Sequence, residues 1–494
     1  MPTELTPKRA CRGFAACCAL LAALGCPGAL AADRTTREST IEAGLGYERV
    51  RLPGNEKMGL AAGWVLFPLG GQWWAGPAVY GAADGRRGGL FVGGGELQRR
   101  VDLPWGWDLR AGLFAGGGGG AAAPVGGGLM LRAAATLSHD FGPLRGGLSW
   151  SRISFPSGDI GSSQIGLVLN WERAFRSFDA QLAGQPQPTG GTTGLGIQRL
   201  AGTVSTYRLR GADTRHVGLV GARAEWPTRP SGLYTGIEAA AAASGGAAGY
   251  MEILGDVGWR WTPLAALPVS FEARGALGLG GGGGMPTGGG ALGKIAVGAS
   301  VEFGRGWRAG VELGEVRGLG SPLRAHSGQI WLAMDLEPPP AAPGSGTISR
   351  NEWSATLQHH LRTHRRDGTV GSLDTVGLKL DRYVGPHVYL SGQAHSAYAG
   401  GAGAYSIGLI GAGLASAPAA YRFGVELLVG AAGGGGVASG NGAIVQSIAW
   451  ASWSVTPQSQ LRFGVGGVKS IRGGDLKSPV LELSWTRALG LGGR

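Results

Sequence analysis

Ser138, His139 and Asp140 are the residue types of a hydrolytic triad, and they follow one another directly in the sequence. A triad works only when its nucleophile, base and carboxylate converge on one point. Consecutive residues of a strand point to opposite faces, so these three cannot converge among themselves. The corresponding segments of two further repeats, 302–304 and 454–456, read Glu-Phe-Gly and Ser-Val-Thr. We therefore expect a polar strand end here and no enzymatic activity.

Five of the eight histidines lie in the last third of the chain: His359, His360, His364, His387 and His395. On a strand, His360, Arg362 and His364 would share a face, a pattern that could bind a metal or respond to pH. The guanidinium of Arg362 would repel a cation, and the nearest carboxylate, Asp367, falls in the following turn. We expect a basic lumen or loop rim here, with no metal and no cofactor.

Three glycine runs, 116–120, 280–284 and 433–436, invite comparison with a phosphate-binding loop. They lack the Gly-Lys-Ser/Thr ending of such a loop, and no helical pattern follows them. Glycine has no side chain, so a run of it lets one backbone approach another closely. The runs therefore predict close-packed hairpins at equivalent places in three copies of one module.

The repeat extends beyond the glycines. The last glycines of the runs, at 120, 284 and 436, are 164 and 152 residues apart. Internal repetition of this length decides the architecture before any local interpretation. It divides the chain into a signal segment (1–31), a first β repeat (32–180), a linker (181–199), a second β repeat (200–336), a Pro/Gly-rich linker (337–351) and a third β repeat (352–494).

Within each repeat, apolar residues alternate with polar or very small ones. Ile41, Ala43, Leu45 and Tyr47 fall on one face of a strand, and the residues between them on the other. Eight such segments fit the first repeat, near 40–52, 58–68, 73–83, 88–99, 106–116, 127–139, 144–154 and 162–172. About ten residues is the length of a tilted strand that crosses a hydrocarbon layer. Short turn signals between the segments predict antiparallel hairpins.

The first 31 residues predict Sec-type export. Lys8, Arg9 and Arg12 precede a short apolar run, and residues 29–31 (Ala-Leu-Ala) fit a cleavage site. A lipoprotein signal acylated at Cys26 is the alternative. All four cysteines lie in this segment, so the rest of the chain has no disulfide, thiol nucleophile or cysteine metal site.

Composition argues against a disordered polar chain and against a helical membrane protein. Charged residues make up 15 %, mean hydropathy is slightly positive, and no apolar run after the signal is long enough for a membrane helix. Tryptophans gather near predicted strand ends, as at 73–74 and 105–107, which is typical of an interfacial belt rather than of a soluble sandwich. Over residues 40–489 the pattern resembles the bacterial outer-membrane β-barrel proteins, at the level of the class. One departure is the C-terminus, Leu-Gly-Leu-Gly-Gly-Arg, which lacks the terminal aromatic residue usual in that class.

We expect an all-β fold in which the three eight-stranded repeats close together as one transmembrane antiparallel barrel of about 24 strands. Three tandem eight-stranded barrels are the alternative, because eight strands already leave an interior that side chains can fill. Glycines such as Gly44, Gly46 and Gly310 are expected to leave space in the lumen. The residues expected to face the lumen are Glu42, Glu48, Asp108, Arg110, Arg132, Glu272, Arg274, Glu302, Arg308 and Glu312.

Three functions fit this architecture. We expect a passive channel or export pore in the outer membrane of a Gram-negative bacterium. The mature charge of about +10 favours anionic solutes or polymer. A lipid-modifying enzyme, or a structural or surface-binding barrel without conductance, are the alternatives. Expected partners are outer-membrane lipid and lipopolysaccharide, the barrel-assembly machinery and a separate periplasmic export partner, with no nucleic acid.

Overall fold

The computed structural model describes residues 36–187, 191–211, 213–228, 232–263, 268–304, 306–337 and 346–493. The predicted signal segment and Cys26 lie outside these residues. Within them the chain is all-β, with 24 strands and three short 3₁₀ turns, η1 (Pro53–Asn55), η2 (Pro104–Gly106) and η3 (Ala180–Leu182). No helix in the described ranges is long and apolar enough to span a membrane.

The strands fall into three sets of eight. The first set is β1 (Thr36–Arg51), β2 (Lys57–Gly70), β3 (Trp73–Asp84), β4 (Phe91–Asp102), β5 (Trp107–Gly119), β6 (Leu129–Asp140), β7 (Arg145–Ser154) and β8 (Gly161–Phe178). The second is β9 (Arg199–Leu209), β10 (His216–Pro227), β11 (Leu233–Ala242), β12 (Met251–Trp261), β13 (Val269–Gly281), β14 (Ala291–Phe303), β15 (Trp307–Gly318) and β16 (Arg324–Asp335). The third is β17 (Thr347–His364), β18 (Val370–Tyr383), β19 (Val388–Ala399), β20 (Ser406–Ala415), β21 (Tyr421–Gly433), β22 (Ala443–Ser454), β23 (Ser459–Ser470) and β24 (Lys477–Gly493).

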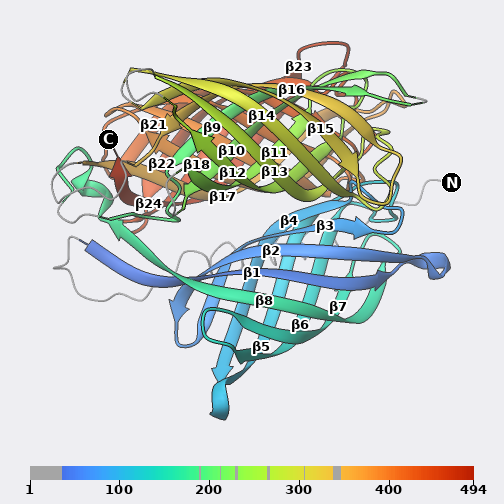
Figure 1. Cartoon of the computed structure of the whole chain (residues 1–494), viewed down its shortest axis with the longest axis horizontal. Coiled ribbons are helices and arrows are strands. Elements are labelled where there is room, and N and C mark those ends of the chain that lie inside the picture. Colours follow the sequence, from blue (N-terminus) through green and yellow to red (C-terminus); the bar gives the residue numbers. More distant parts are fainter. Residues whose placement is uncertain are drawn as a thin grey trace.

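Each set closes on itself. β1 pairs with β8 from Thr36–Phe178 to Glu48–Gly166, β9 pairs with β16, and β17 pairs with β24. A single bridge, Gly490–Phe178, joins the first set to the third. The expected single barrel of about 24 strands is therefore wrong: the described strands form three closed eight-stranded barrels, here called barrels 1, 2 and 3. In Figure 1 the blue-to-teal strands of barrel 1 form one body below the green-to-red strands of barrels 2 and 3.

The reason for this closure lies at the strand edges. A strand edge must have its N–H and C=O groups paired, above all where no water is present. The first strand of each repeat finds those partners on the eighth strand of the same repeat. The interior of an eight-stranded barrel is just wide enough to be filled by side chains, and the inward-facing charges fill it with ion pairs.

The outer faces are apolar. Leu45 and Tyr47 are exposed on the outer face of β1, while Ile41 on the same face is buried and Ala43 is half-buried. Exposed leucine, isoleucine and valine side chains recur on all three barrels, for example Leu113 of β5 and Leu313 of β15. An apolar exterior around a polar interior is the arrangement of a transmembrane barrel.

The lumen-facing glycines do not leave space empty. A Cβ added to Gly44 would lie 2.3 Å from the indole of Trp64, and one added to Gly310 would lie 2.3 Å from the indole of Trp331. Each glycine makes room for a large ring from the neighbouring strand, because a close-packed interior has no vacant volume for both. The expectation of unfilled space at these glycines is wrong for that reason.

The two ends of each barrel differ. The terminal end carries the linkers and three turns per barrel, and the hairpin end carries the turns that join its strands 1–2, 3–4, 5–6 and 7–8. Most of the exposed large aromatic residues of the described chain lie at the terminal end: Trp73, Trp105, Trp107, Phe141, Trp259, Trp261, Phe271, Phe303, Trp307, Tyr421, Phe423 and Trp453. Such a belt places the terminal end at a membrane–water interface.

Candidate functional site

The lumen of barrel 1 is filled by a chain of ion pairs. Arg110, on β5, lies between Asp108, whose Oδ1 is 2.6 Å from Nε, and Glu42 of β1, with which it is also paired. Arg132 donates to Glu48 at 3.0 Å. All five residues lie on the inward, polar faces of β1, β5 and β6, and their side chains are at most 10 % exposed. Buried charges require such pairing, since an unpaired one would carry a large desolvation cost.

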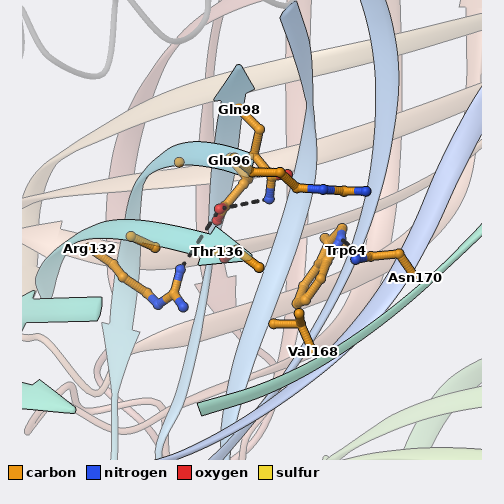
Figure 2. A pocket seen from close by; sticks show the side chains of 10 residues that line it. Trp64, Glu96, Gln98, Arg132, Thr136, Val168 and Asn170 are labelled. Carbon is orange, nitrogen blue, oxygen red and sulfur yellow. Dashed lines mark hydrogen bonds and ion pairs between the residues drawn. The ribbon is translucent and has the colours of Figure 1, made fainter. Parts of the chain in front are cut away.

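A small cavity lies within that lumen. Figure 2 shows Trp64 pointing toward Asn170, and Glu96 lying between Gln98 and Arg132, to which dashed lines join it. The cavity that these side chains surround has a volume of about 20 Å³. That is room for about one water molecule. A cavity of this size is much smaller than the continuous aqueous path that an ion needs.

Barrel 2 has the densest network. Arg223 pairs with Glu312 at 2.6 Å, and Arg274 pairs with Glu312 at 2.8 Å and with Glu238 at 2.9 Å. Glu272 accepts from Arg260 at 2.9 Å. Of the residues expected to face a lumen, Glu272, Arg274 and Glu312 thus lie together in one buried cluster. Glu302 and Arg308 pair with each other instead, half-buried at the terminal end and apart from that cluster.

Barrel 3 carries an equivalent network that the sequence-based set of lumen residues omitted. Lys379 pairs with Glu426, and Arg462 contacts Asp381 at 3.2 Å and Glu426 at 2.9 Å. All of these side chains are at most 1 % exposed. The sequence signal for Glu426 was present, because strand 5 of each repeat carries an inward charge pair. These pairs are Asp108 and Arg110, Glu272 and Arg274, and Arg422 and Glu426.

The hairpin end of each barrel is sealed by apolar side chains. The turn between strands 5 and 6 folds inward and buries Val125 in barrel 1, Met285 in barrel 2 and Val437 in barrel 3. In barrel 1, Val125 belongs to the same buried cluster as Leu90 and Phe155 from the neighbouring turns. The glycine runs lead directly into these turns, and their flexible backbone permits the inward fold. Each lumen therefore ends in a dry apolar layer.

An arginine in each barrel holds the inward-folded turn in place. Arg87 donates to the carbonyl oxygens of Ala121 and Ala122 at 3.0 and 2.9 Å and pairs with Glu56 at 2.7 Å. The hydrogen bond from Arg87 holds the pKa of Glu56 below its usual range. The sequence did not predict the contact between Arg87 and the turn carbonyls, because an arginine in a turn is usually a solvated charge.

The same contact recurs in the other two barrels. Arg215 donates to the carbonyl of Gly284 at 3.3 Å, and its hydrogen bonds lower the pKa of Asp213. Arg365 donates to the carbonyls of Gly435 at 3.0 Å and of Gly400 at 2.8 Å. Carbonyl groups without a ladder partner need such donors, so the three arginines fix otherwise irregular backbone.

The glycine turns also join the three barrels in a ring. Gly88 of barrel 1 donates its N–H to the carbonyl of Gly288 in barrel 2 at 2.8 Å. Gly403 of barrel 3 donates to Gly126 of barrel 1 at 3.2 Å. A Cβ on Gly249 of barrel 2 would lie 2.9 Å from the backbone nitrogen of Gly434 in barrel 3. In each contact the 5–6 turn of one barrel meets the 3–4 turn of the next, an order that closes into a pseudo-threefold ring.

Charge is distributed unevenly between the ends. Outside the lumens, in the hairpin-end turns or within four residues of them, stand seventeen basic and seven acidic side chains. They are Arg49, Arg51, Lys57, Arg86, Arg87, Arg152, Arg208, Arg210, Arg215, Arg317, Arg324, Arg362, Arg365, Arg366, Lys469, Arg472 and Lys477, against Glu56, Asp84, Asp159, Asp213, Glu315, Asp367 and Asp475. Their excess of ten positive charges equals the net charge of the whole chain after residue 31. We call this surface the basic rim.

The residues that resemble a triad point apart. The Ser138 hydroxyl donates to Asp108 inside barrel 1 at 3.2 Å, whereas the His139 ring lies outside it, between Trp107 and Phe141. Asp140 pairs with Arg145 at 3.0 Å. Alternation along β6 puts His139 on the opposite face from Ser138 and Asp140, and each of the three has a structural partner of its own.

The histidine pattern on β17 is broken by a bulge. The pairing register with β18 shifts between His360 and Thr363, so His360 faces the lumen while Arg362 and His364 face outward at the rim. An inserted residue reverses the alternation beyond it, and the expected shared face is therefore wrong. Among the described residues no group of three or more histidine, cysteine or acidic side chains is arranged to hold a metal ion.

Comparison with known proteins gives a class likeness and no family. No family model matches the chain, and no curated protein matches it. Among solved structures it is similar to the FrpB iron transporter of Neisseria meningitidis, at 9 % identity over 92 % of this chain and 81 % of that one, with a TM-score of 0.28. It is also similar to OccK2 of Pseudomonas aeruginosa in complex with glucuronate, at 13 % identity over 92 % and 98 %, with a TM-score of 0.21. These are outer-membrane β-barrel proteins, and the resemblance extends to that class.

Proposed function

We propose that this protein is an outer-membrane barrel that does not conduct through its lumens and instead presents a structural, surface-binding platform. The observation that carries the proposal is the interior of the barrels. Interlocked ion pairs fill the three lumens, such as Arg274 between Glu238 and Glu312, and an apolar layer closes the hairpin end of each. An ion crossing such a barrel would have to break several buried charge pairs, each costly to separate.

The binding surface in this proposal is the basic rim. The linkers, the start of β1 and the end of β24 lie on the side opposite the basic rim. Insertion with this terminal end in the periplasm therefore places the basic rim at the outer surface of a Gram-negative bacterium. Lipopolysaccharide there carries phosphate groups, and clustered arginines pair with phosphate strongly and often in bidentate fashion. Exposed members such as Arg86 and Arg472 are accessible to a headgroup.

The proposal includes a route to the outer membrane and the absence of enzymatic activity. Sec export followed by the barrel-assembly machinery brings the chain to the outer membrane, and the protein is not an enzyme. The separation of Ser138, His139 and Asp140 supports the last point, since the residues most like a catalytic set have structural partners and diverge. A separate periplasmic export partner has no role in a protein whose lumens stay closed.

Two measurements on the purified full-length protein test the proposal. In planar bilayers we expect no stable conductance, and discrete openings would contradict the sealed lumens. Binding to immobilised lipopolysaccharide should weaken steeply with salt, because screening acts on exposed charges. A charge-reversed rim variant, Arg86→Glu with Arg472→Glu, should bind at least tenfold more weakly than wild type. Equal binding of lipopolysaccharide by the wild type and the variant would refute the proposed surface-binding function.

A passive channel is the second candidate function, and one observation favours it. Outside the lumens, a cavity of about 1340 Å³ lies between the barrels and is lined in part by Arg215, Arg365 and Arg366. Solute passing between the barrels along this space would meet positive charge, which favours anions. Anion-selective openings in the bilayer measurement, unchanged when a lumen ion pair is removed, would support this candidate over the first.

A further inference from the structure

The cavity between the barrels has walls unlike those of an aqueous passage. Its roof is the ring of glycine turns, including Gly89 and Gly120 of barrel 1, Gly249 of barrel 2 and Gly434 of barrel 3. Its walls are outer faces of β10–β12 and β18–β21, with side chains such as Ile253 and Ile410. These faces belong to the apolar exterior of barrels 2 and 3, at membrane depth below the hairpin end.

Small residues keep these walls smooth. Ala239 and Ala241 line the cavity from β11, and Gly408 and Gly430 line it from β20 and β21. Small side chains on facing membrane segments usually let two backbones approach each other closely. Here the walls formed by barrels 2 and 3 stay apart and enclose about 1340 Å³. The small residues therefore line a groove between the two barrels and do not form a direct contact between their strands.

Positive charge gathers where the walls meet the roof. Arg215, Arg365 and Arg366 line the cavity there. The acidic lining residues are Asp475, at the exposed rim, and Glu252, whose buried carboxylate accepts hydrogen bonds from Tyr207 and Tyr250. Arg365 is held by the carbonyls of Gly435 and Gly400, which fixes its charge in place. Among the described residues the guanidinium of Arg366 has one contact, a 3.4 Å hydrogen bond from Nε to the carbonyl of Val437.

We propose that this cavity binds one anionic phospholipid with two acyl chains, whose phosphate lies at Arg366 and Arg365 and whose chains fill the space between barrels 2 and 3. The proposal rests on membrane insertion as proposed above. An apolar space in a membrane would lose van der Waals contacts if it stayed empty. Charge complementarity selects an anionic headgroup at the arginines.

Size selects a two-chain lipid. A water molecule occupies about 30 Å³ and a methylene group is of similar size, so the cavity holds on the order of forty such groups. That number corresponds to the acyl chains of one phospholipid. The six or so chains of a lipopolysaccharide molecule would exceed it, and pockets for drug-sized molecules are smaller, at about 300–1,000 Å³.

Native mass spectrometry of the full-length protein, extracted from membranes in mild detergent, tests the proposal. We expect one two-chain anionic phospholipid per protein chain. After delipidation, phosphatidylglycerol should rebind at least tenfold more tightly than phosphatidylcholine, which has the same chains without the net charge. A lipid-free protein, a bound neutral lipid, lipopolysaccharide bound with no phospholipid beside it, or equal rebinding of the two probes would each overturn the proposal.

Matched variants place the lipid. Arg366→Glu should lower the bound phospholipid at least tenfold, whereas Arg152→Glu, on the same rim but outside the cavity, should not. Ala239→Trp should fill the groove and displace the lipid, whereas Ala273→Trp, exposed on the outer face of β13, should retain it. Loss of lipid in the control variants, or retention in Arg366→Glu and Ala239→Trp, would refute the site.

The two proposals fail in different ways. If the wild-type protein does not fractionate with the outer membrane, the proposed function fails and the lipid site fails with it. If the protein inserts, resists heat as a folded barrel and carries no phospholipid, only the lipid site fails. Heat-modifiable migration of each variant on gels confirms that a lost lipid is not a lost fold.

Discussion

Arg274→Met should destabilise barrel 2 strongly although it removes no part of any surface. Arg274 is 1 % exposed and donates at 2.9 Å to Glu238 and at 2.8 Å to Glu312. Removing one member of a buried ion-pair network leaves its partners charged and unpaired, which typically costs about 3–5 kcal/mol. In a wide aqueous lumen the same pairs would be solvated and worth at most about 1 kcal/mol.

The assay is urea unfolding of the full-length protein in detergent micelles, followed by tryptophan fluorescence and by heat-modifiable migration on gels. Barrel 2 contains Trp331, whose ring lies over Arg223 of the same network, so fluorescence should report its loss directly. The matched control is Arg317→Met, which removes an exposed arginine paired only with Glu315 on the outer face of β15. We expect no measurable change in the control.

Two results would refute the reasoning. If Arg274→Met and Arg317→Met unfold at the same urea concentration as wild type, the lumen of barrel 2 is wet and its charges are solvated. If Arg274→Met opens a conductance without loss of stability, the network acts as a removable plug. Replacing the whole network by apolar residues of similar volume is a different experiment, since that change can be neutral or stabilising.

Three further predictions follow from the faces, the ring and the rim. Leu45→Arg places a charge on the exposed outer face near the middle of β1 and should cost about 2–4 kcal/mol in lipid, measured by urea unfolding in vesicles; no cost would mean that this face lies in water. Gly403→Val should break the contact between barrels 3 and 1, because its Cβ would lie 2.6 Å from a backbone nitrogen, and should speed proteolysis of the linkers while each barrel stays heat-modifiable. Gly371→Val is the control, because an added Cβ there would meet open space. Equal cleavage of the two variants would show that the contact at Gly403 does not hold barrels 1 and 3 together. Because Arg87 lowers the pKa of Glu56 in the folded state, that carboxylate stabilises the 5–6 turn of barrel 1 above the ordinary glutamate pKa of about 4.3 and loses this effect as the pH falls through its lowered value. Hydrogen exchange in the turn should rise over that acid range in wild type and be independent of pH in Glu56→Gln, after correction for the intrinsic rate; identical profiles would show that the pair does not hold the turn.

The local structure was readable from the sequence because alternation has a direct physical cause. The pleat of a strand sends Glu42, Asp108 and Arg110 to one face and Leu45 to the other, whatever the strand pairs with. The strand positions in the first repeat follow from this pattern, since the turn signals between segments are short. The charge pairs on strand 5 of each repeat follow from the internal repetition in the same way.

Closure was not readable, because it depends on contacts between residues far apart in the chain. The edge of β1 could have paired with β24 in one wall or with β8 in its own repeat, and alternation is identical in both. What decides between them is volume: Trp64 over Gly44 and the ion pairs fill a narrow interior. A glycine reads as empty space in a sequence, and only the packing shows which ring occupies it.

Two further features depend on single-residue irregularities. The bulge between His360 and Thr363 reverses the face of His364, and no sequence signal marks it. The inward fold that buries Val125 uses backbone conformations that glycine permits but does not dictate. The contacts of Arg87 and Arg365 with turn carbonyls follow from that fold, so they could not be inferred before it.

The measurement that tests most directly whether each repeat closes and seals itself is the folding of residues 32–180 alone in detergent and in lipid vesicles. If β1 pairs with β8 and the ion pairs of Glu42, Asp108 and Arg110 fill the interior, this fragment should become a heat-modifiable, protease-resistant barrel that conducts no ions. A fragment that stays unfolded, or folds only when the second and third repeats are added, would contradict the account, because its first and eighth strands would then need partners from the rest of the chain.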